Sequence, residues 1–525
     1  MRSNASFRDT RLEILSRKHS LVAERNLGDF FCAKFVNDHS HNIYMAKIED
    51  FSVKSSICIS NFVFLLSNTR IMIESIAITN FYSFNETTKI SFVAGRERNK
   101  VSDELYCGFS TQNRVNLLKM VFLYGDNGAG KSKLLLAFDV LQHLVTTFRD
   151  DKMDTLPFCE FALDPYKENS QPSEIEMVYH FDGNRYRYYI KWNESVILEE
   201  RLNLLKVVTE TELYYRWYDF EEKVVKVTYG RAMNMDDDTA YIIRTSLLRN
   251  NSVISIIAST NIYNKVLHDQ LSFFRNGFEL VELSDIDLGE MLPDGKRLDG
   301  RNLKKVILAL LKSIGSNIVN FEKIPLNKRI PSALRARMRN MSEEEQQMML
   351  DFFEFAPDYA VKTYHDIGWR RPQPLDLEVQ SEGTKEILRL ILCMHEAIVE
   401  HKTLLLDDCI NGIHPKTLEQ LMKFYLGASE DSQLIIASQN FSNLDGAMLR
   451  RDSLRFITKN VHGESRVEQM NLGDLHKNQN LRMQVENSEK WGVKPTIDEM
   501  ILEDTIRGYR REVMRNDNSF FSELF

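Results

Sequence analysis

The feature of the sequence that most restricts its fold is the glycine-rich stretch Gly-Asp-Asn-Gly-Ala-Gly-Lys-Ser at residues 125–132. It fits the pattern G-x-x-x-x-G-K-[ST], follows the apolar run NLLKMVFLY at 116–124 and precedes the run KLLLAFDVLQHLV at 133–145, which has helical spacing. Continuous apolar runs are typical of strands that are buried on both faces of a parallel sheet. The sequence therefore predicts an α/β fold in which this loop joins a buried strand to a helix.

Each part of this loop suits the binding of phosphate groups. Glycines let backbone N–H groups converge on phosphate oxygens, and the following helix adds its positive N-terminal end. Lys131 can place its ammonium between the β- and γ-phosphates of ATP, and the Ser132 hydroxyl can bind Mg²⁺. An ordinary glycine-rich turn is the alternative, but the strand before it and the helix after it favour phosphate. The expected binding residues are Gly125, Asp126, Asn127, Gly128, Ala129, Gly130, Lys131 and Ser132.

A loop of this kind needs a second strand that carries a carboxylate for the metal. The run Thr-Leu-Leu-Leu-Asp-Asp at 403–408 is the natural candidate, because a buried strand there would end in two acids. We expect Asp407 to hold Mg²⁺ through water and Asp408 to orient or deprotonate the attacking water. A strand that ends in a solvated Asp-Asp turn is the alternative.

Changes of pattern along the chain predict its organisation. Residues 72–84 alternate like a strand, 174–230 have the composition of an antiparallel meander, and 303–314 and 343–353 have helical spacing. We therefore expect a P-loop head with a mixed sheet and an antiparallel β subdomain, split by a mostly helical insertion. The expected divisions are lobes at 72–231 and 366–490, the insertion at 232–365 and a helical tail at 491–525. Residues 1–71 are either an added module or text upstream of a true start at Met72.

The composition is that of an ordinary globular protein. Among the 525 residues, 43% are hydrophobic and 27% charged, and the net charge of −8 excludes a globally basic nucleic-acid binder. The six cysteines form no CxxC pair, which argues against a structural zinc site and fits a reducing cytosol. The apolar stretch at 57–67 is shorter than the ~20 residues that cross a bilayer. We expect a cytoplasmic protein.

One local basic stretch could still bind nucleic acid. Six basic residues lie between positions 323 and 339: Lys323, Lys328, Arg329, Arg335, Arg337 and Arg339. Such a stripe can contact the phosphates of DNA or RNA. A surface for a partner protein and a solvated helix face are the alternatives, and the acidic run Ser-Glu-Glu-Glu at 342–345 follows at once.

Several motifs in a fixed order resemble a known family. The stretch Ser-Glu-Gly-Thr at 381–384 is by itself a common helix start. Together with MIESIAITNFYSF at 72–84, the glycine-rich loop, LLLDD before His414-Pro415 and LIIAS at 434–438, it resembles the ABC-type ATPases related to SMC, RecF and OLD proteins. More narrowly it is similar to the RloA-like and abortive-infection ATPases of bacterial defence systems.

The resemblance implies a mechanism as well as a fold. In that family two heads dimerise around ATP, so Ser381 and Gly383 would meet the γ-phosphate held by the partner head. Two positions depart from the family pattern: Asp408 stands where a Glu is usual, and Gln439 stands where a switch His is usual. We therefore expect ATP binding and closure of a homodimer with slow hydrolysis. A helper such as His414 could instead fill the gap.

These features leave more than one function open. The first is the sensor or scaffold subunit of an anti-phage defence system that works with a separate effector, a nuclease or a toxin. The alternative is a DNA-repair or chromosome-maintenance ATPase of RecF or SMC type that acts on DNA directly, and a scaffold with little turnover is a third. A nuclease of OLD type would need a metal-binding domain after the ATPase, and no Glu and Asp-x-Asp set follows Gln439.

Overall fold

The computed structural model describes part of the chain, and all of that part belongs to the second of its two units, residues 62–525. The expected module at 1–71 lies outside the described residues except for Ile71. The described residues are 71–95, 105–110, 115–163, 171–326, 330, 332–339, 341–354, 359–407, 410, 412–440, 450–470, 481–486 and 499–522.

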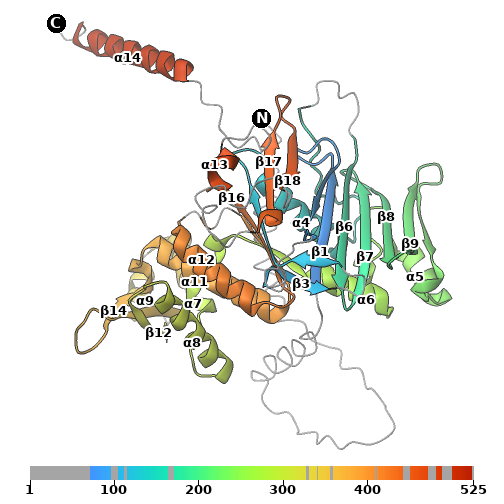
Figure 1. Cartoon of the computed structure of the whole chain (residues 1–525), viewed down its shortest axis with the longest axis horizontal. Coiled ribbons are helices and arrows are strands. Elements are labelled where there is room, and N and C mark those ends of the chain that lie inside the picture. The colour runs from blue at the N-terminus through green and yellow to red at the C-terminus, as the bar shows by residue number, and fades with distance from the viewer. Residues whose placement is uncertain are drawn as a thin grey trace, which may run out of the picture. The chain divides into compact units, whose positions relative to one another are not determined.

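An antiparallel sheet of seven strands forms the β subdomain, and it contains the predicted meander (Figure 1). The hairpin between the strands Ser173–Phe181 and Asn184–Trp192 turns at Asp182 and Gly183, whose φ angles of 48° and 75° suit the tight Asp-Gly turn. The strands in spatial order are β10 (Val224–Tyr229), β9 (Glu210–Asp219), β8 (Ile197–Leu205), β7 (Asn184–Trp192), β6 (Ser173–Phe181), β1 (Ile71–Thr79) and β2 (Thr88–Ser91). The strand expected at 72–84 therefore ends earlier, at Thr79.

A second sheet of six strands is parallel except for its last strand. Its strands in spatial order are β11 (Phe278–Val281), β15 (Thr403–Asp407), β16 (Gln433–Ser438), β5 (Met120–Tyr124), β17 (Leu454–Lys459) and β18 (Ser465–Gln469). The apolar runs at 403–407 and 433–438 are strands here, as predicted. Each is buried on both faces, because alternate side chains join two different apolar cores.

The two cores lie on opposite faces of this parallel sheet. One contains Leu405 with helix α4 (Lys131–Thr146) and the β subdomain. The other contains Leu404 and Leu406 with helices α11 (Glu382–Glu400) and α12 (Pro415–Ala428). The parallel sheet is therefore the middle layer of an α/β fold, and the carboxyl ends of its strands face the loops that carry the candidate site.

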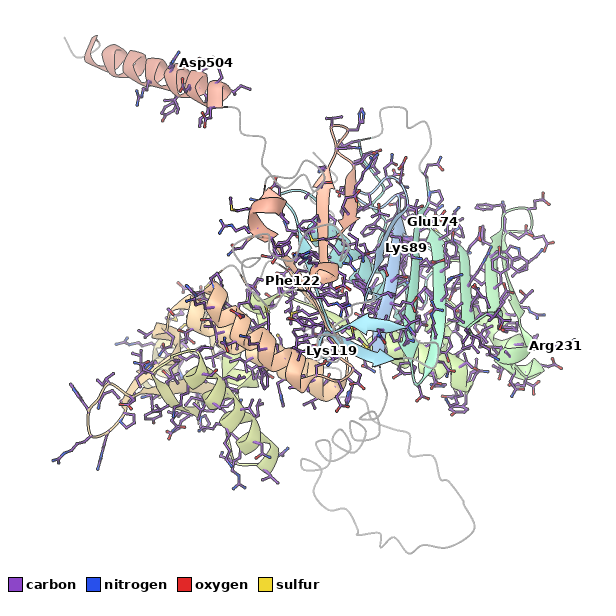
Figure 2. All side chains as sticks on the ribbon, viewed as in Figure 1. Lys89, Lys119, Phe122, Glu174, Arg231 and Asp504 are labelled. Atoms are coloured by element: carbon purple, nitrogen blue, oxygen red, sulfur yellow. The ribbon has the colours of Figure 1, made fainter. Side chains whose placement is uncertain are left out.

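The predicted single strand at 116–124 is in fact two. Residues Asn116–Leu118 form β4, which pairs with β3 (Cys107–Ser110), and only Met120–Tyr124 join the parallel sheet. Lys119 lies between them, and its buried ammonium donates hydrogen bonds to the carbonyls of Ser429 and Leu426 at 2.5 and 3.4 Å. Its side chain and that of Phe122 are labelled in Figure 2. The charged side chain marks the point at which the chain leaves one sheet for the other.

The segment 232–365 contains helices, but it is not a simple helical arm. Strand β11 lies within it and pairs in parallel with β15, so Phe278–Val281 belong to the sheet of the head. Helix α6 (Lys265–Asn276) contacts α4 and places Phe273 and Phe274 in the core shared with the β subdomain. The expected boundary at 231/232 is therefore not a boundary of the head. Sequence periodicity missed β11 because four residues are too few to show it.

The rest of this segment forms a small α+β unit before the head resumes. A three-stranded sheet joins β12 (Ile318–Pro325), β13 (Tyr359–His365) and β14 (Gln373–Asp376). The predicted helices at 303–314 and 343–353 are confirmed as α8 (Leu298–Ser313) and α10 (Glu343–Glu354). The other helices of the segment are α5 (Asp237–Ser246), α7 (Leu288–Met291) and α9 (Ser332–Met338).

The described residues after Met470 form two helices. They are α13 (Leu481–Glu486) and α14 (Glu499–Ser522), so the predicted tail at 491–525 is helical over its described part. Among the described residues, no helix is both long and apolar enough to cross a membrane.

Candidate nucleotide site

The glycine-rich loop joins β5 to α4, as the sequence predicts. Gly128 and Gly130 have φ angles of 78° and 117°, conformations that residues with a Cβ rarely adopt. A Cβ on Gly125 would collide with the backbone carbonyl of Ile457 on β17. The loop therefore needs glycine at these three positions, two for conformation and one for close packing.

Lys131 is buried at the start of α4, and its ammonium turns back over the loop. It donates hydrogen bonds to the carbonyl oxygens of Gly125 and Asp126 at 2.7 and 3.0 Å. Burial raises the pKa of the Asp126 carboxyl, and the charge of Lys131 opposes that rise. Gly125, Asp126 and Ala129 form the frame of the loop, whereas the cavity beside it is lined by Asn127, Gly128, Gly130, Lys131 and Ser132.

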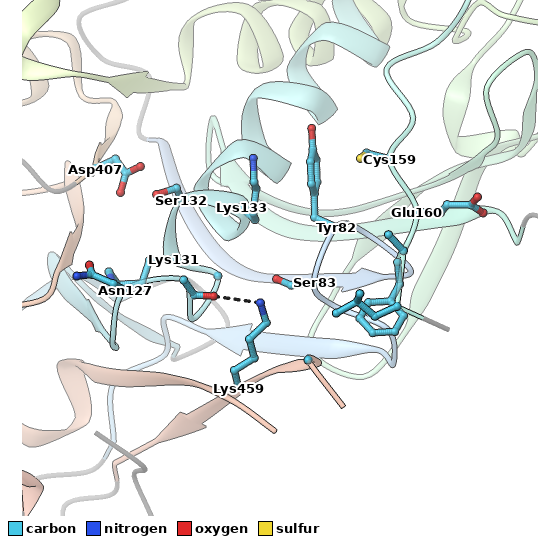
Figure 3. Close-up of a pocket in the computed structure, with 16 residues that line it drawn as sticks. Tyr82, Ser83, Asn127, Lys131, Ser132, Lys133, Cys159, Glu160, Asp407 and Lys459 are labelled. Atoms are coloured by element: carbon cyan, nitrogen blue, oxygen red, sulfur yellow. Dashed lines mark hydrogen bonds between the residues drawn. The ribbon is translucent and has the colours of Figure 1, made fainter. Parts of the chain in front are cut away.

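Asp407 lines the same cavity, although it is far away in the sequence. It ends β15, and β16 separates that strand from β5 in the sheet. Figure 3 shows the carboxylate of Asp407 and the hydroxyl of Ser132 directed toward the same space. The Oδ1 atom of Asp407 is buried and has no hydrogen-bond partner among the described residues. A buried carboxylate oxygen without a partner is costly, which marks it as a place for a ligand.

The remaining wall of this cavity of about 460 Å³ was not predicted from the sequence. It comes from three separate segments: Tyr82 and Ser83 after β1, residues 159–163, and Lys459 and Gly463 at the β17–β18 turn. The ammonium of Lys133 lies 4.3 Å from the centre of the Tyr82 ring. The pKa of Tyr82 is raised, mainly because its side chain is buried and secondly because Cys159 lies close to it.

Strands β17 and β18 also brace the glycine-rich loop from outside. The Lys459 ammonium donates to the carbonyl of Gly128 at 3.3 Å, the contact drawn in Figure 3. The Ser465 hydroxyl donates to the carbonyl of Ala129 at 2.5 Å, and its oxygen lies 2.7 Å from the hydroxyl oxygen of Ser83. These contacts join the end of the head to the loop across more than 300 residues, so no local sequence signal could reveal them.

Three further predicted residues, Ser381, Gly383 and Gln439, do not line this cavity. Ser381 is the N-cap of α11, where its hydroxyl accepts a hydrogen bond from the N–H of Thr384, and Gly383 lies beside the carbonyl of Gly412. Gln439 follows the last residue of β16. Asp408 lies outside the described residues.

The basic stripe is only partly described. Lys323 lies on β12, where its ammonium donates to the carbonyl of Glu290 and sits 4.1 Å from the centre of the Tyr359 ring. Arg335, Arg337 and Arg339 are exposed on and after α9, while Lys328 and Arg329 lie outside the described residues. The nucleic-acid surface at 323–339 stays a prediction.

A family model matches the part of the chain that carries the glycine-rich loop and Asp407. Residues 120–444, more than half of the chain, match the family described as "AAA domain, putative AbiEii toxin, Type IV TA system". The chain belongs to this AAA family. The chain therefore has an AAA-type ATPase domain of the abortive-infection kind, as the order of its motifs predicted.

Solved structures give a more distant comparison. An SMC head domain from Thermotoga maritima is 11% identical with a TM-score of 0.36, covering 76% of this chain and 99% of that chain. An SMC head bound to the C-terminal winged-helix domain of ScpA is 12% identical with a TM-score of 0.37, covering 76% and 98%. No curated protein matches this chain.

Proposed function

We propose that the chain binds ATP together with Mg²⁺ in the cavity beside the glycine-rich loop. The observation that carries the proposal is the meeting of Lys131, Ser132 and the unpartnered oxygen of Asp407 in one cavity. The loop N–H groups and the start of α4 would hold the phosphates, and the Lys131 ammonium would leave the loop carbonyls for them. The ring of Tyr82 is suitably placed to flank the nucleoside.

The residues present fit a magnesium ion. Mg²⁺ prefers oxygen ligands and usually keeps several waters, so one hydroxyl and one carboxylate are a sufficient protein contribution. Ser132 and Asp407 would supply them. When bound, the ion neutralises charge on the β- and γ-phosphates of ATP.

We further propose that hydrolysis is slow. Asp408 would act on the attacking water, but its side chain is one methylene shorter than the usual Glu, and Gln439 offers a neutral amide in place of an imidazole. A misplacement near one ångström can lower a rate on the order of 10²-fold. ATP would therefore hold the protein in one state for a long time and act as a timer.

A second head completes the site in this proposal. Ser381 and Glu382 are exposed at the start of a helix of 19 residues, and they do not line the cavity of their own chain. Helix N-termini bind phosphate, so the helix of one copy would meet the γ-phosphate held by another, with Ser381 and Gly383 in contact. In an Asp408→Asn background, the mass measured in solution should double with Mg-ATP, and with Ser381→Arg added it should stay single. Doubling of Ser381→Arg would exclude this arrangement.

The biological role we propose is a sensor or scaffold subunit of an anti-phage system with a separate effector. The family description, which names a toxin of a toxin–antitoxin system, supports it. The test is phage plating on cells that carry this chain with its neighbouring gene, with either gene alone, and with Lys131→Ala. Protection should need both genes and an intact Lys131, whereas equal protection by Lys131→Ala would contradict the proposal.

A further inference from the structure

The β13–β14 hairpin ends in an exposed tip that none of the site chemistry uses. The tip is Asp366-Ile-Gly-Trp-Arg-Arg-Pro372, and every one of its residues is exposed. Its tryptophan, Trp369, is 69% exposed, an unusual state for so large an apolar ring. Arg370 and Arg371 follow it, and neither guanidinium forms an ion pair with any described residue.

The tip has a defined conformation. Gly368 has a φ angle of 79°, and its N–H donates to the Asp366 carboxylate at 3.0 Å. The side-chain amide of Gln373 donates to the carbonyl of Arg371 at 3.0 Å. The ring and the two guanidiniums are thus presented at the end of a hairpin whose turn is already formed.

We propose that this tip binds single-stranded nucleic acid. An exposed indole can stack on an unpaired base, and guanidiniums bind phosphate, so three consecutive residues offer both halves of a nucleotide contact. The chain has a net charge of −8, so an anionic strand needs such a local cationic point. A convex tip of seven residues is small for a protein partner, which usually buries about 800 Å² per side. This inference rests on the proposed function, because it names the trigger for the ATPase.

The same hairpin is tied to the start of α11. Gln380 immediately precedes Ser381, and its amide donates to the hydroxyl of Thr363 and to Nε2 of His365, both at 2.7 Å. Thr363 in turn donates to the carbonyl of Leu375 on β14 at 2.9 Å. Gln380 therefore bonds the base of the hairpin directly beside the residue that caps α11. A nucleic-acid strand bound at the tip would therefore restrain the start of α11, which we propose contacts ATP.

Binding is tested with labelled 20-residue oligothymidine and oligouridine, by fluorescence anisotropy of the full chain without nucleotide. Trp369→Ala should weaken binding roughly tenfold, the scale of one stacked base. The double variant Arg370→Ala, Arg371→Ala should reduce the slope of log K against log salt concentration by about 1.4. Each phosphate contact on a single strand contributes about 0.7 to this slope. Arg301→Ala, an exposed arginine on α8, is the matched control and should change neither.

Three results would overturn the proposal: no binding by the wild type, equal binding by the tip variants, or tighter binding of duplex than of single strands. Capture of an acidic protein through the tip, without nucleic acid, would also overturn it.

The coupling between the tip and the ATP site is measured separately, as the ratio of the ATPase rates with and without oligonucleotide. Gln380→Ala should bring this ratio to about one while oligonucleotide binding persists. Because the anisotropy needs no ATP, absence of ATP binding would refute the proposed function without deciding this binding.

Discussion

Gln433 and Ile73 exchange two hydrogen bonds across 360 positions of the chain. The Ile73 N–H donates to Oε1 of Gln433 at 2.7 Å, and Nε2 of Gln433 donates to the Ile73 carbonyl at 3.0 Å. This pairing occurs where β1 has a register irregularity between Ile73 and Ser75. Gln433 begins β16, so one buried amide joins the β subdomain to the parallel sheet.

Replacing this amide should destabilise the head. Gln433→Ala also removes contacts to the hydroxyl of Thr403 and the carbonyl of Leu118. Buried groups left without partners cost about 1–3 kcal/mol each, so we expect the free energy of unfolding to fall by roughly 2–4 kcal/mol. Chemical denaturation measures it, with Gln469→Ala as the control at a half-buried glutamine. A loss equal to that of the control would show that the junction does not depend on Gln433.

Lys131→Ala should abolish tight ATP binding while leaving the fold intact. In the absence of nucleotide the ammonium donates to two loop carbonyls, and its loss removes the charge that would meet the phosphates. Hydrogen bonds to charged groups contribute about 1.5–3 kcal/mol, so affinity should fall roughly 10–100-fold. Titration calorimetry gives the affinity, and Lys312→Ala, an exposed lysine on α8, is the control. Unchanged affinity in Lys131→Ala would place the nucleotide elsewhere.

Asp407→Asn should remove the effect of Mg²⁺ and leave the effect of ATP alone. Its Oδ1 has no partner among the described residues, so replacing the charge with an amide should leave the thermal midpoint of the nucleotide-free protein unchanged or raised. The additional stabilisation that Mg²⁺ gives in the presence of ATP should disappear. Thermal unfolding with ATP, with and without Mg²⁺, measures both effects. A variant that still gains stability from Mg²⁺ would exclude Asp407 as a metal residue.

The buried ion pair of Glu74 should make stability depend on acid pH. Burial acts to raise the pKa of Glu74, but hydrogen bonds from His180 and Arg185 outweigh it and lower that pKa from 4.5 to about 2. Since the folded pKa lies below the unfolded one, this stabilisation is present above pH 4.5 and is lost as the pH falls toward 2. The free energy of unfolding of Glu74→Gln should vary less over that interval than that of the wild type. Parallel slopes for the two proteins would contradict the assignment.

The sequence predicted the parts of the molecule whose signals are local. The glycine-rich loop, the apolar strand before Asp407 and the cap at Ser381 each depend on a few neighbouring residues, and the structure has the same elements there. The tight turn at Asp182 and Gly183 likewise depends on two neighbouring residues.

The parts that were missed depend on distant segments. Strand β11 has four residues and pairs with a strand more than 100 residues later, so no periodicity announces it. Tyr82 and Lys459 enter the cavity only because separate turns fold back on the glycine-rich loop. The split at Lys119 is set by carbonyls of Leu426 and Ser429, which the apolar run itself does not reveal.

The most direct test of the account is single-turnover hydrolysis of labelled ATP by excess protein with Mg²⁺. The account predicts that the wild type holds ATP and hydrolyses it slowly, and that Asp408→Glu combined with Gln439→His accelerates hydrolysis by roughly tenfold or more, as restored geometry should. Lys131→Ala is the control without bound nucleotide. Rapid hydrolysis by the wild type, unchanged in the double variant, would contradict the account.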